Sequence, residues 1–193
     1  MKRLDAAELS EIFAGQPIIA AVKDELELER ALLSEVIAVF VLFGDILSIG
    51  GIVSRINKQG KHAFVHVDLV EGLSSREIAV DFIAASTAAD GIISTKSAMI
   101  SRAKSHGLIA IQRFFLLDSL AIRGIERQIR QKDSADFIEV LPGLMPKIIL
   151  SLTSSLTTPV IAGGLVSDKE DVVAALAAGA IAVSSTNERV WSM

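Results

Sequence analysis

The chain has 193 residues, no cysteine and a formal net charge of −4; 51% of its residues are hydrophobic and 22% are charged. This composition is too apolar for a disordered chain, and a chain without cysteine holds neither a disulfide framework nor a thiolate metal site. The negative charge gives the chain no general attraction to nucleic acid or anionic lipid, so any binding of a polyanion must be local.

The N-terminal segment carries Asp5 and Glu8 and lacks a long apolar core. It therefore does not resemble a signal peptide, and we expect a cytoplasmic protein. The mean hydropathy is +0.51, and residues 36–54, 148–167 and 172–187 are nearly uncharged. Asp45 and Pro159 interrupt the first two stretches and the third is short, so we expect no membrane span. Strands buried on both faces of a parallel sheet produce the same apolar runs.

Eight short runs of aliphatic and β-branched residues recur along the chain, and each is typical of a buried strand. In chain order they cover residues 18–23, 36–43, 62–69, 91–95, 108–115, 136–141, 159–165 and 180–185. The regular spacing leaves room for one short helix and two tight loops between successive strands. The pattern therefore predicts alternating strands and helices.

Helical patterns fill the segments between these runs. Residues 24–34 place Leu28, Leu32 and Leu33 on one face, with charged residues opposite. Residues 75–86 start with a serine, and residues 168–178 start with an aspartate suited to the N-cap and are followed by Gly179, a residue typical of a helix end.

Eight strand–helix alternations without a linker predict a single domain over residues 1–193, a compact (β/α)8 barrel of the TIM type. An open doubly wound sheet is the alternative, but the chain lacks its G-x-G-x-x-G motif. Only residues 186–193 follow the last strand, so the last helix must be truncated. The seam between the last and first strands could be covered by the tail with Trp191, by residues 5–13, or by a partner subunit in a homo-oligomer.

The carboxyl ends of the strands are where a β/α barrel carries its function. The residues there are Lys23, Asp45, Asp68, Glu71, Thr95, Lys96, Gln112, Arg113, Glu139, Gly163, Gly164, Ser184, Ser185 and Thr186. Two glycines at the seventh strand and hydroxyls at the eighth suit an anion, because backbone N–H groups can approach it closely. We therefore expect a phosphate site there, although the glycines could serve only a tight turn.

Glu139 lies between Ile138 and Val140 in a predicted strand, so its side chain points to the opposite face from theirs, into the barrel. A buried carboxylate needs a partner, and we expect Arg113 or Lys96. The sequence leaves two roles open for Glu139: it could bind a ligand hydroxyl or form a structural ion pair beneath the site.

His66 and Asp68 are two residues apart and would share one face of the third strand. A His–Asp pair suggests a general base, but no nucleophile accompanies it. We therefore expect His66 to be an interior histidine with satisfied hydrogen bonds, and Asp68 to recognise a hydroxyl. Asp45, Asp68 and Glu71 could hold a divalent metal, although no spacing demands one.

Arg123, Arg127 and Arg130 follow the fifth strand at helical spacings that place them on one face. They form the one patterned basic feature that could contact RNA. No aromatic residue lies among them and the chain is acidic overall, so a solvated helix face explains them more readily.

Several blocks of the sequence are similar to one bacterial family, the glycerol-3-phosphate responsive antiterminators, or glycerol uptake operon antiterminator regulatory proteins. The blocks are HVDLVEGL (66–73), GIISTK (91–96), AIQRFFLLDS (110–119), DFIEVLPG (136–143), PVIAGGL (159–165) and AVSSTN (182–187). The resemblance covers most of the chain.

This resemblance implies a barrel that is not an enzyme and needs no cofactor. It would sense glycerol 3-phosphate as its effector and bind the leader mRNA of a glycerol-metabolism operon, so that transcription passes a terminator. The candidate effector-binding residues are the strand-end residues given above, other than Thr95 and Gln112. The alternative is a barrel isomerase or lyase for a small sugar phosphate, with Asp68 and Glu139 as its acid and base.

Overall fold

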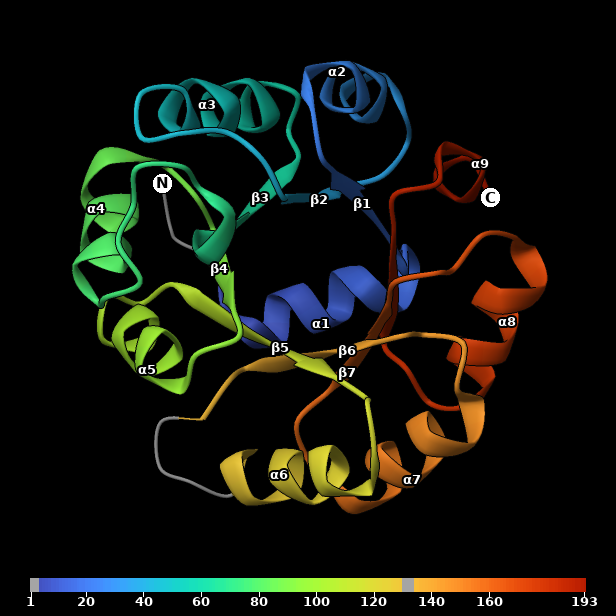
Figure 1. Cartoon of the computed structure of the whole chain (residues 1–193). Helices are drawn as coiled ribbons and strands as arrows, with labels where there is room; N and C mark the ends of the chain where they lie inside the picture. The colour runs from blue at the N-terminus through green and yellow to red at the C-terminus, as the bar shows by residue number, and fades with distance from the viewer. Residues whose placement is uncertain (1–3, 130–133) are drawn as a thin grey trace.

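The computed structural model describes residues 4–129 and 134–193, and its strands close into an eight-stranded parallel barrel in which β8 pairs with β1 (Figure 1). The strands are β1 (Ile18–Val22), β2 (Ala38–Val41), β3 (His62–His66), β4 (Gly91–Ser94), β5 (Ile109–Phe115), β6 (Phe137–Leu141), β7 (Val160–Gly163) and β8 (Ala182–Ser185). Each lies within its predicted range, so the predicted TIM-type barrel is confirmed.

In Figure 1 most of the helices form a ring outside the strands, whereas α1 (Ala6–Gly15) lies across the centre of the barrel. The others are α2 (Glu25–Leu33), α3 (Ile49–Lys58), the short 3-10 helix η1 (Val67–Leu69), α4 (Ile78–Ser86), α5 (Ser97–Ser105), α6 (Ser119–Ile129), α7 (Pro146–Ser155), α8 (Lys169–Ala177) and α9 (Glu188–Trp191). No helix in the described residues is long and apolar enough to cross a membrane.

Capping side chains explain where two of the predicted helices start. The Asp24 carboxylate accepts the Glu27 N–H at the start of α2, and that of Asp168 accepts the Asp171 N–H at the start of α8. The prediction for α4 was wrong at its start, because Ser75 precedes the helix, which begins after Glu77 without a side-chain cap. Leu33 was also misplaced: it is exposed at the end of α2.

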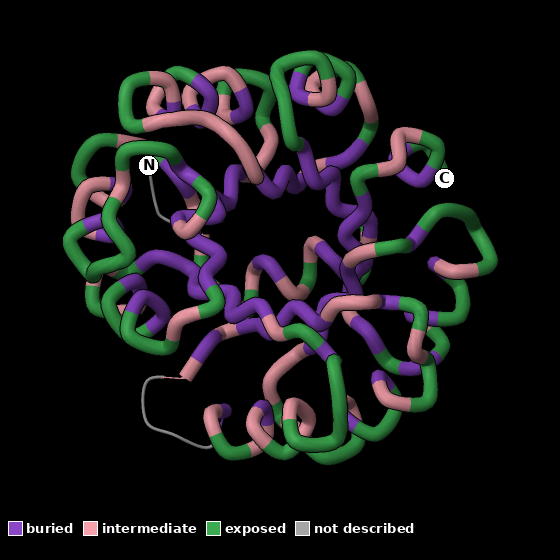
Figure 2. Tube along the Cα trace, viewed as in Figure 1, coloured by how far each residue is buried: buried purple, intermediate pink, exposed green. Residues whose placement is uncertain are grey.

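Both faces of the barrel strands are buried, which accounts for the high hydropathy (Figure 2). Outward side chains such as Val39 and Val65 pack beneath the helices. Inward side chains such as Phe40 and Phe64 fill the barrel, where their rings meet edge to face at 5.8 Å. The two sets alternate along each strand, as the pleat requires.

Helix α1 closes the amino-terminal end of the barrel. Its Leu9 and Phe13 are fully buried, and the Phe13 ring lies edge-on to Phe137, the first residue of β6, at 6.0 Å. A reciprocal capping box of Asp5 and Glu8 fixes the start of the helix. Residues 5–13 therefore form a plug for the barrel interior and do not cover the β8–β1 seam.

The C-terminal tail covers the seam between β8 and β1. It forms only the four-residue helix α9, as the predicted truncation requires. Val190 and Trp191 are buried, and the indole Nε1–H donates to the Ser185 carbonyl at 2.7 Å. An ion pair between Arg30 and Glu188 joins α9 to α2. Of the two covers that the chain itself could supply, the seam is therefore covered by the tail with Trp191.

Candidate functional site

A pocket of about 290 Å³ opens at the carboxyl end of the barrel. Its lining consists of Ala21, Leu42, Arg113, Glu139, Leu141, Gly164, Leu165, Val166, Ser167, Ser184, Ser185, Thr186 and Asn187. Six predicted site residues are therefore brought together, and they come from β5, β6, β7 and β8 or the loops that follow these strands. This is the end of the barrel at which β/α barrels bind their ligands.

Both carboxylate oxygens of Glu139 are engaged at the pocket floor. Arg113 Nε donates to Oε2 and Ser184 Oγ donates to Oε1, each at 2.6 Å. The side chains of Arg113 and Glu139 are only 8% and 1% exposed. Arg113 is therefore the partner of Glu139, as one of the two predicted alternatives had it. Strand register explains the pairing, because the two residues lie opposite each other on β5 and β6.

Arg113 keeps part of its guanidinium available. Only Nε bonds to Glu139, and within the described part of the chain the two Nη atoms have no hydrogen-bond acceptor. A planar guanidinium edge with free N–H groups is suited to phosphate or carboxylate oxygens. Glu139 thus holds the arginine in place while leaving its binding edge free.

Gly163 has a structural reason to be glycine. A β-carbon at this position would lie 2.6 Å from Glu139 Oε1 and 2.6 Å from Ser184 Oγ. The absent side chain therefore leaves room for the buried Glu139–Ser184 hydrogen bond. This close approach, which the sequence does not show, gives Gly163 a role beneath the pocket.

The loop after β7 turns through two left-handed residues, Gly164 at φ +72° and Leu165 at φ +63°. Leucine rarely adopts this conformation, which costs about 1–3 kcal/mol when it is held there. The Leu165 side chain is 74% exposed, so packing does not explain the strain. Sequence patterns gave no signal for it, because leucine has no preference for positive φ.

Hydrogen bonds join the loops after β7 and β8. The Ser185 hydroxyl donates to the Val166 carbonyl at 2.7 Å and accepts the Asn187 N–H, and Asn187 Nδ2 donates to the Ser167 carbonyl at 2.9 Å. Ser185 is thereby occupied by the backbone, whereas Thr186 is exposed at the rim. Ser167 and Asn187 were missed by sequence reasoning, since only the short distance between the loops reveals them.

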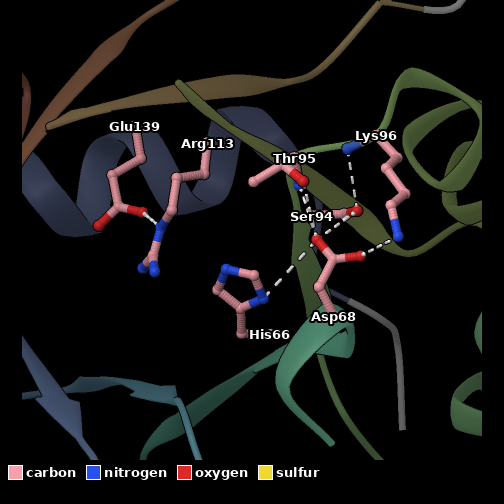
Figure 3. A network of polar contacts seen from close by, with 7 residues as sticks. All are labelled: His66, Asp68, Ser94, Thr95, Lys96, Arg113 and Glu139. Atoms are coloured by element: carbon pink, nitrogen blue, oxygen red, sulfur yellow. Dashed lines mark hydrogen bonds and ion pairs between the residues drawn. The ribbon is translucent and has the colours of Figure 1, made fainter. Parts of the chain in front are cut away.

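Asp68 forms a second cluster, beside β4 (Figure 3). Its Oδ2 accepts the Thr95 N–H at 2.8 Å and the Ser94 hydroxyl at 3.0 Å, and its Oδ1 lies 3.5 Å from Lys96 Nζ. Burial alone would raise the pKa of Asp68, but these hydrogen bonds and the nearby charges outweigh it and lower the pKa below its usual value. Asp68 is therefore ionised at neutral pH.

The predicted strand face shared by His66 and Asp68 was wrong. Strand β3 ends at His66, and the chain then turns into η1, which carries Asp68. The two side chains nevertheless approach, with His66 Nδ1 3.9 Å from Asp68 Oδ2. That separation is too long for a hydrogen bond.

His66 is an interior histidine, as expected, but its hydrogen bonds are not satisfied. Its side chain is 4% exposed, and Nδ1 has no hydrogen-bond partner among the described residues. Burial, and next the positive charge of Arg113, lower the pKa of His66 to about 4, against the opposing effect of Asp68. The ring is therefore neutral at pH 7.

Six of the twelve predicted effector-binding residues lie outside the pocket lining: Asp68, Lys96 and Gly163, described above, and Lys23, Asp45 and Glu71. Lys23 is exposed and pairs with Glu27 at 3.2 Å. The Asp45 carboxylate accepts the N–H groups of Ser48 and Leu47, which lower its pKa and fix the loop after β2. Glu71 is exposed and bonds to that loop through its backbone. In the described chain no three acidic or histidine side chains gather as metal ligands, so the metal site considered above is not formed.

The remaining candidates lie outside the barrel. Gln112 points outward and donates to Ser97 Oγ and Gln128 Oε1, which ties β5 to α5 and α6. Arg123 and Arg127 are exposed on α6, as the helical spacing predicted. Arg130 lies outside the described residues.

Comparisons with known proteins agree with the resemblance seen in the sequence. Residues 18–191 match the family described as glycerol-3-phosphate responsive antiterminator. The chain is 44% identical over 185 residues to the uncharacterized protein YgcP of Escherichia coli (strain K12), covering 96% of both chains.

Two crystal structures are similar to this fold. One is the glycerol uptake operon antiterminator regulatory protein of Listeria monocytogenes str. 4b F2365, with TM-score 0.86, 36% identity and coverage of 91% of this chain and 95% of that one. The other is a glycerol uptake operon antiterminator-related protein of Thermotoga maritima MSB8, with TM-score 0.80, 35% identity and coverage of 91% and 98%. The chain therefore belongs to the glycerol-3-phosphate responsive antiterminator family.

Proposed function

We propose that this protein senses glycerol 3-phosphate at the mouth of the barrel and, in the bound state, binds the leader mRNA of a glycerol-metabolism operon so that transcription passes a terminator. The observation that carries the ligand assignment is the free guanidinium edge of Arg113 at the floor of a pocket formed by the loops after β7 and β8. Family membership supports glycerol 3-phosphate as the effector.

The pocket chemistry suits a small phosphorylated polyol. Its volume of about 290 Å³ lies just below the range of about 300 to 1,000 Å³ typical of sites for larger ligands, which suits a small molecule. Arg113 supplies a cation with free N–H groups, and the left-handed Gly164–Leu165 turn brings backbone close to the pocket. The Ser184 and Thr186 hydroxyls line the same space. We assign the phosphate to this side of the mouth.

We further propose that the protein acts without turning over its ligand. Glu139 has both oxygens engaged in short hydrogen bonds, so it is not a free base. His66, with a pKa of about 4, is a weak base at neutral pH. Both features disfavour the alternative of a sugar-phosphate isomerase or lyase, and conversion of a triose- or hexose-phosphate by the purified protein would restore it.

Sensing requires a coupling between the two ligands. Glycerol 3-phosphate must bind the RNA-competent conformation better than the other, and RNA must tighten effector binding by the same factor. Because the net charge is −4, the RNA contact must come from a local basic surface. Arg123 and Arg127, exposed on α6, together with Arg130, which follows them in the sequence, are our candidate.

The effector assignment is tested by ligand-induced thermal stabilisation. Valine at Gly164 is strained at φ +72°, and its β-carbon would crowd Leu141, so Gly164→Val should abolish the shift in melting temperature caused by glycerol 3-phosphate. Gly60→Val is the matched control, because Gly60 also has φ +72° but lies in the turn before β3. The control variant should have a lower melting temperature but should still be stabilised by glycerol 3-phosphate. If Gly164→Val is stabilised by the ligand as much as the wild-type protein, the phosphate site does not lie at this loop.

The RNA assignment is tested by retention of a leader transcript on a filter, with and without glycerol 3-phosphate at moderate salt. We expect retention to rise with the effector. Changing Arg123, Arg127 and Arg130 to Ala should weaken binding and flatten its salt dependence. If retention does not change with the effector, the proposed regulatory function is contradicted. If the triple variant binds RNA as tightly as the wild-type protein, only the assignment of these arginines to the RNA contact is contradicted.

A further inference from the structure

Two buried polar atoms at the mouth of the barrel lack hydrogen bonds within the described chain, and they belong to neighbouring side chains. They are His66 Nδ1 and Asp68 Oδ1. Figure 3 shows both side chains on the β3–β4 side of the mouth, across from Arg113 and Glu139. Buried polar groups in native proteins are nearly always paired, so two adjacent exceptions need an explanation.

The two oxygens of Asp68 are used very differently. Oδ2 accepts three donors, the Thr95 N–H and the hydroxyls of Ser94 and Thr95. Among the described residues Oδ1 accepts none, although Lys96 Nζ at 3.5 Å balances part of its charge. The carboxylate is thus fixed in orientation by one oxygen while the other is left as an acceptor without a donor.

The charges of Asp68 and Arg113 favour one tautomer of the His66 imidazole. Its Nδ1 faces the Asp68 carboxylate, and the other ring nitrogen is turned to the side on which Arg113 lies. A neutral imidazole has one donor and one acceptor nitrogen. The anion favours the proton on Nδ1, and the guanidinium favours a lone pair on the other nitrogen, so His66 offers an acceptor to a ligand on the side of Arg113.

We propose that His66 and Asp68 form the diol-binding half of the effector site and set its specificity. This inference rests on the proposed function, in which Arg113 and the loops after β7 and β8 take the phosphate. Two adjacent hydroxyls of a phosphorylated vicinal diol can donate to Asp68 Oδ1 and pair with the imidazole. A carbonyl in place of the central hydroxyl cannot donate, so acceptor would face acceptor and both would stay unpaired.

The site should therefore distinguish glycerol 3-phosphate from dihydroxyacetone phosphate, which has the same carbon skeleton but a ketone at the central carbon. Sites built to bond a hydroxyl reject analogues that lack it more strongly than apolar pockets reject a missing methylene. We expect the wild-type protein to bind glycerol 3-phosphate at least tenfold more tightly than dihydroxyacetone phosphate in calorimetric titrations.

Asp68→Asn is the sharpest variant, because it keeps the shape. Its carbonyl oxygen can still accept from Ser94 and Thr95, and its amide then presents N–H groups where Oδ1 was. The preference for the diol should fall at least tenfold, while the affinity for inorganic phosphate, measured in the same way, should stay within about twofold. Asp90→Asn is the matched control, since Asp90 directly precedes β4 at the opposite end of the barrel and also accepts a backbone N–H, that of Ala63, and it should leave the preference unchanged.

The outcomes separate this inference from the proposed function. If the wild-type protein binds no glycerol 3-phosphate, the proposed function fails. If it binds both compounds equally, or if Asp68→Asn keeps the wild-type preference, the diol assignment fails and the proposed function stands. Should Asp68→Asn not fold, His66→Leu decides instead, because loss of both ring nitrogens must also reduce the preference; an unchanged preference there overturns the assignment.

Discussion

On β3, β5, β6 and β8 the inward side chains change from apolar to polar within two residues, so the two ends of the barrel interior differ. Phe64, Ile111, Phe137 and Ala182 face inward in the apolar interior, and the next inward residues are His66, Arg113, Glu139 and Ser184. The amino-terminal end is closed by α1, whereas the carboxyl end opens into the pocket. Stability and binding are thus assigned to successive layers of the same strands.

The largest effect should come from breaking the polar layer at Glu139. Glu139→Ala leaves Arg113 buried without its partner and removes the acceptor of Ser184. We expect the free energy of unfolding in urea to fall by about 3–5 kcal/mol, and effector binding to be lost. Glu71→Ala, an exposed carboxylate at the same end of the barrel, should change it by less than about 0.5 kcal/mol. Equal effects of the two variants would contradict the pairing.

A substitution at the closed, amino-terminal end of the barrel should lower stability and leave effector binding unchanged. Phe13→Ala removes a fully buried ring that packs on Phe137, and we expect a loss of about 3 kcal/mol in the free energy of unfolding. The affinity of the folded protein for glycerol 3-phosphate should be unchanged in calorimetry. A weakened affinity would show that the apolar interior and the polar residues at the mouth do not act independently.

The buried neutral state of His66 makes a pH-dependent contribution. The folded pKa is about 4, below the unfolded value of about 6.5. Between pH 6.5 and 4 the His66 imidazole binds a proton in the unfolded state but stays neutral in the folded state. The free energy of unfolding therefore falls as the pH falls toward 4. Between pH 7.5 and 4.5 the wild-type protein should lose about 2–3 kcal/mol relative to His66→Phe. If the free energy of unfolding depends on pH in the same way for both proteins, this prediction is contradicted.

Alanine at Gly163 should have a smaller effect on stability, and the control variant should change stability in the opposite direction. A β-carbon at Gly163 would collide with Glu139 and Ser184, so Gly163→Ala should destabilise the fold by about 1–3 kcal/mol. Gly124 lies in α6 with open space around it, so Gly124→Ala should stabilise by about 0.5–1 kcal/mol. Thermal unfolding of both variants checks the pair; the same sign for both would remove the steric argument.

The barrel was predictable because its signals are local. Solid apolar runs mark strands buried on both faces, and aspartates at the N-caps of α2 and α8 mark helix starts. The inward direction of Glu139 also followed from strand alternation alone, and its pairing with Arg113 was one of two alternatives. Alternation failed at Asp68, because the chain leaves the strand after His66 and turns into η1.

The rest of the site depends on distances between strands, which single residues do not encode. The sequence could not show that Gly163 makes room for Glu139 and Ser184, or that Ser185 is occupied by the loop after β7. It also gave no sign that His66 Nδ1 lacks a hydrogen-bond partner within the part of the chain that the structure describes. Strand ends mark the mouth of a barrel, but only packing decides which of their side chains share a pocket.

The central claim is that the open polar end binds the effector through Arg113. It is tested most directly by calorimetric titration of glycerol 3-phosphate into the wild-type protein and Arg113→Lys, which keeps the charge but loses the planar N–H edge. We predict saturable binding at one site, weakened at least tenfold, or by about 1.4 kcal/mol, in the variant. No binding to the wild-type protein, or equal affinity for both proteins, would contradict the claim.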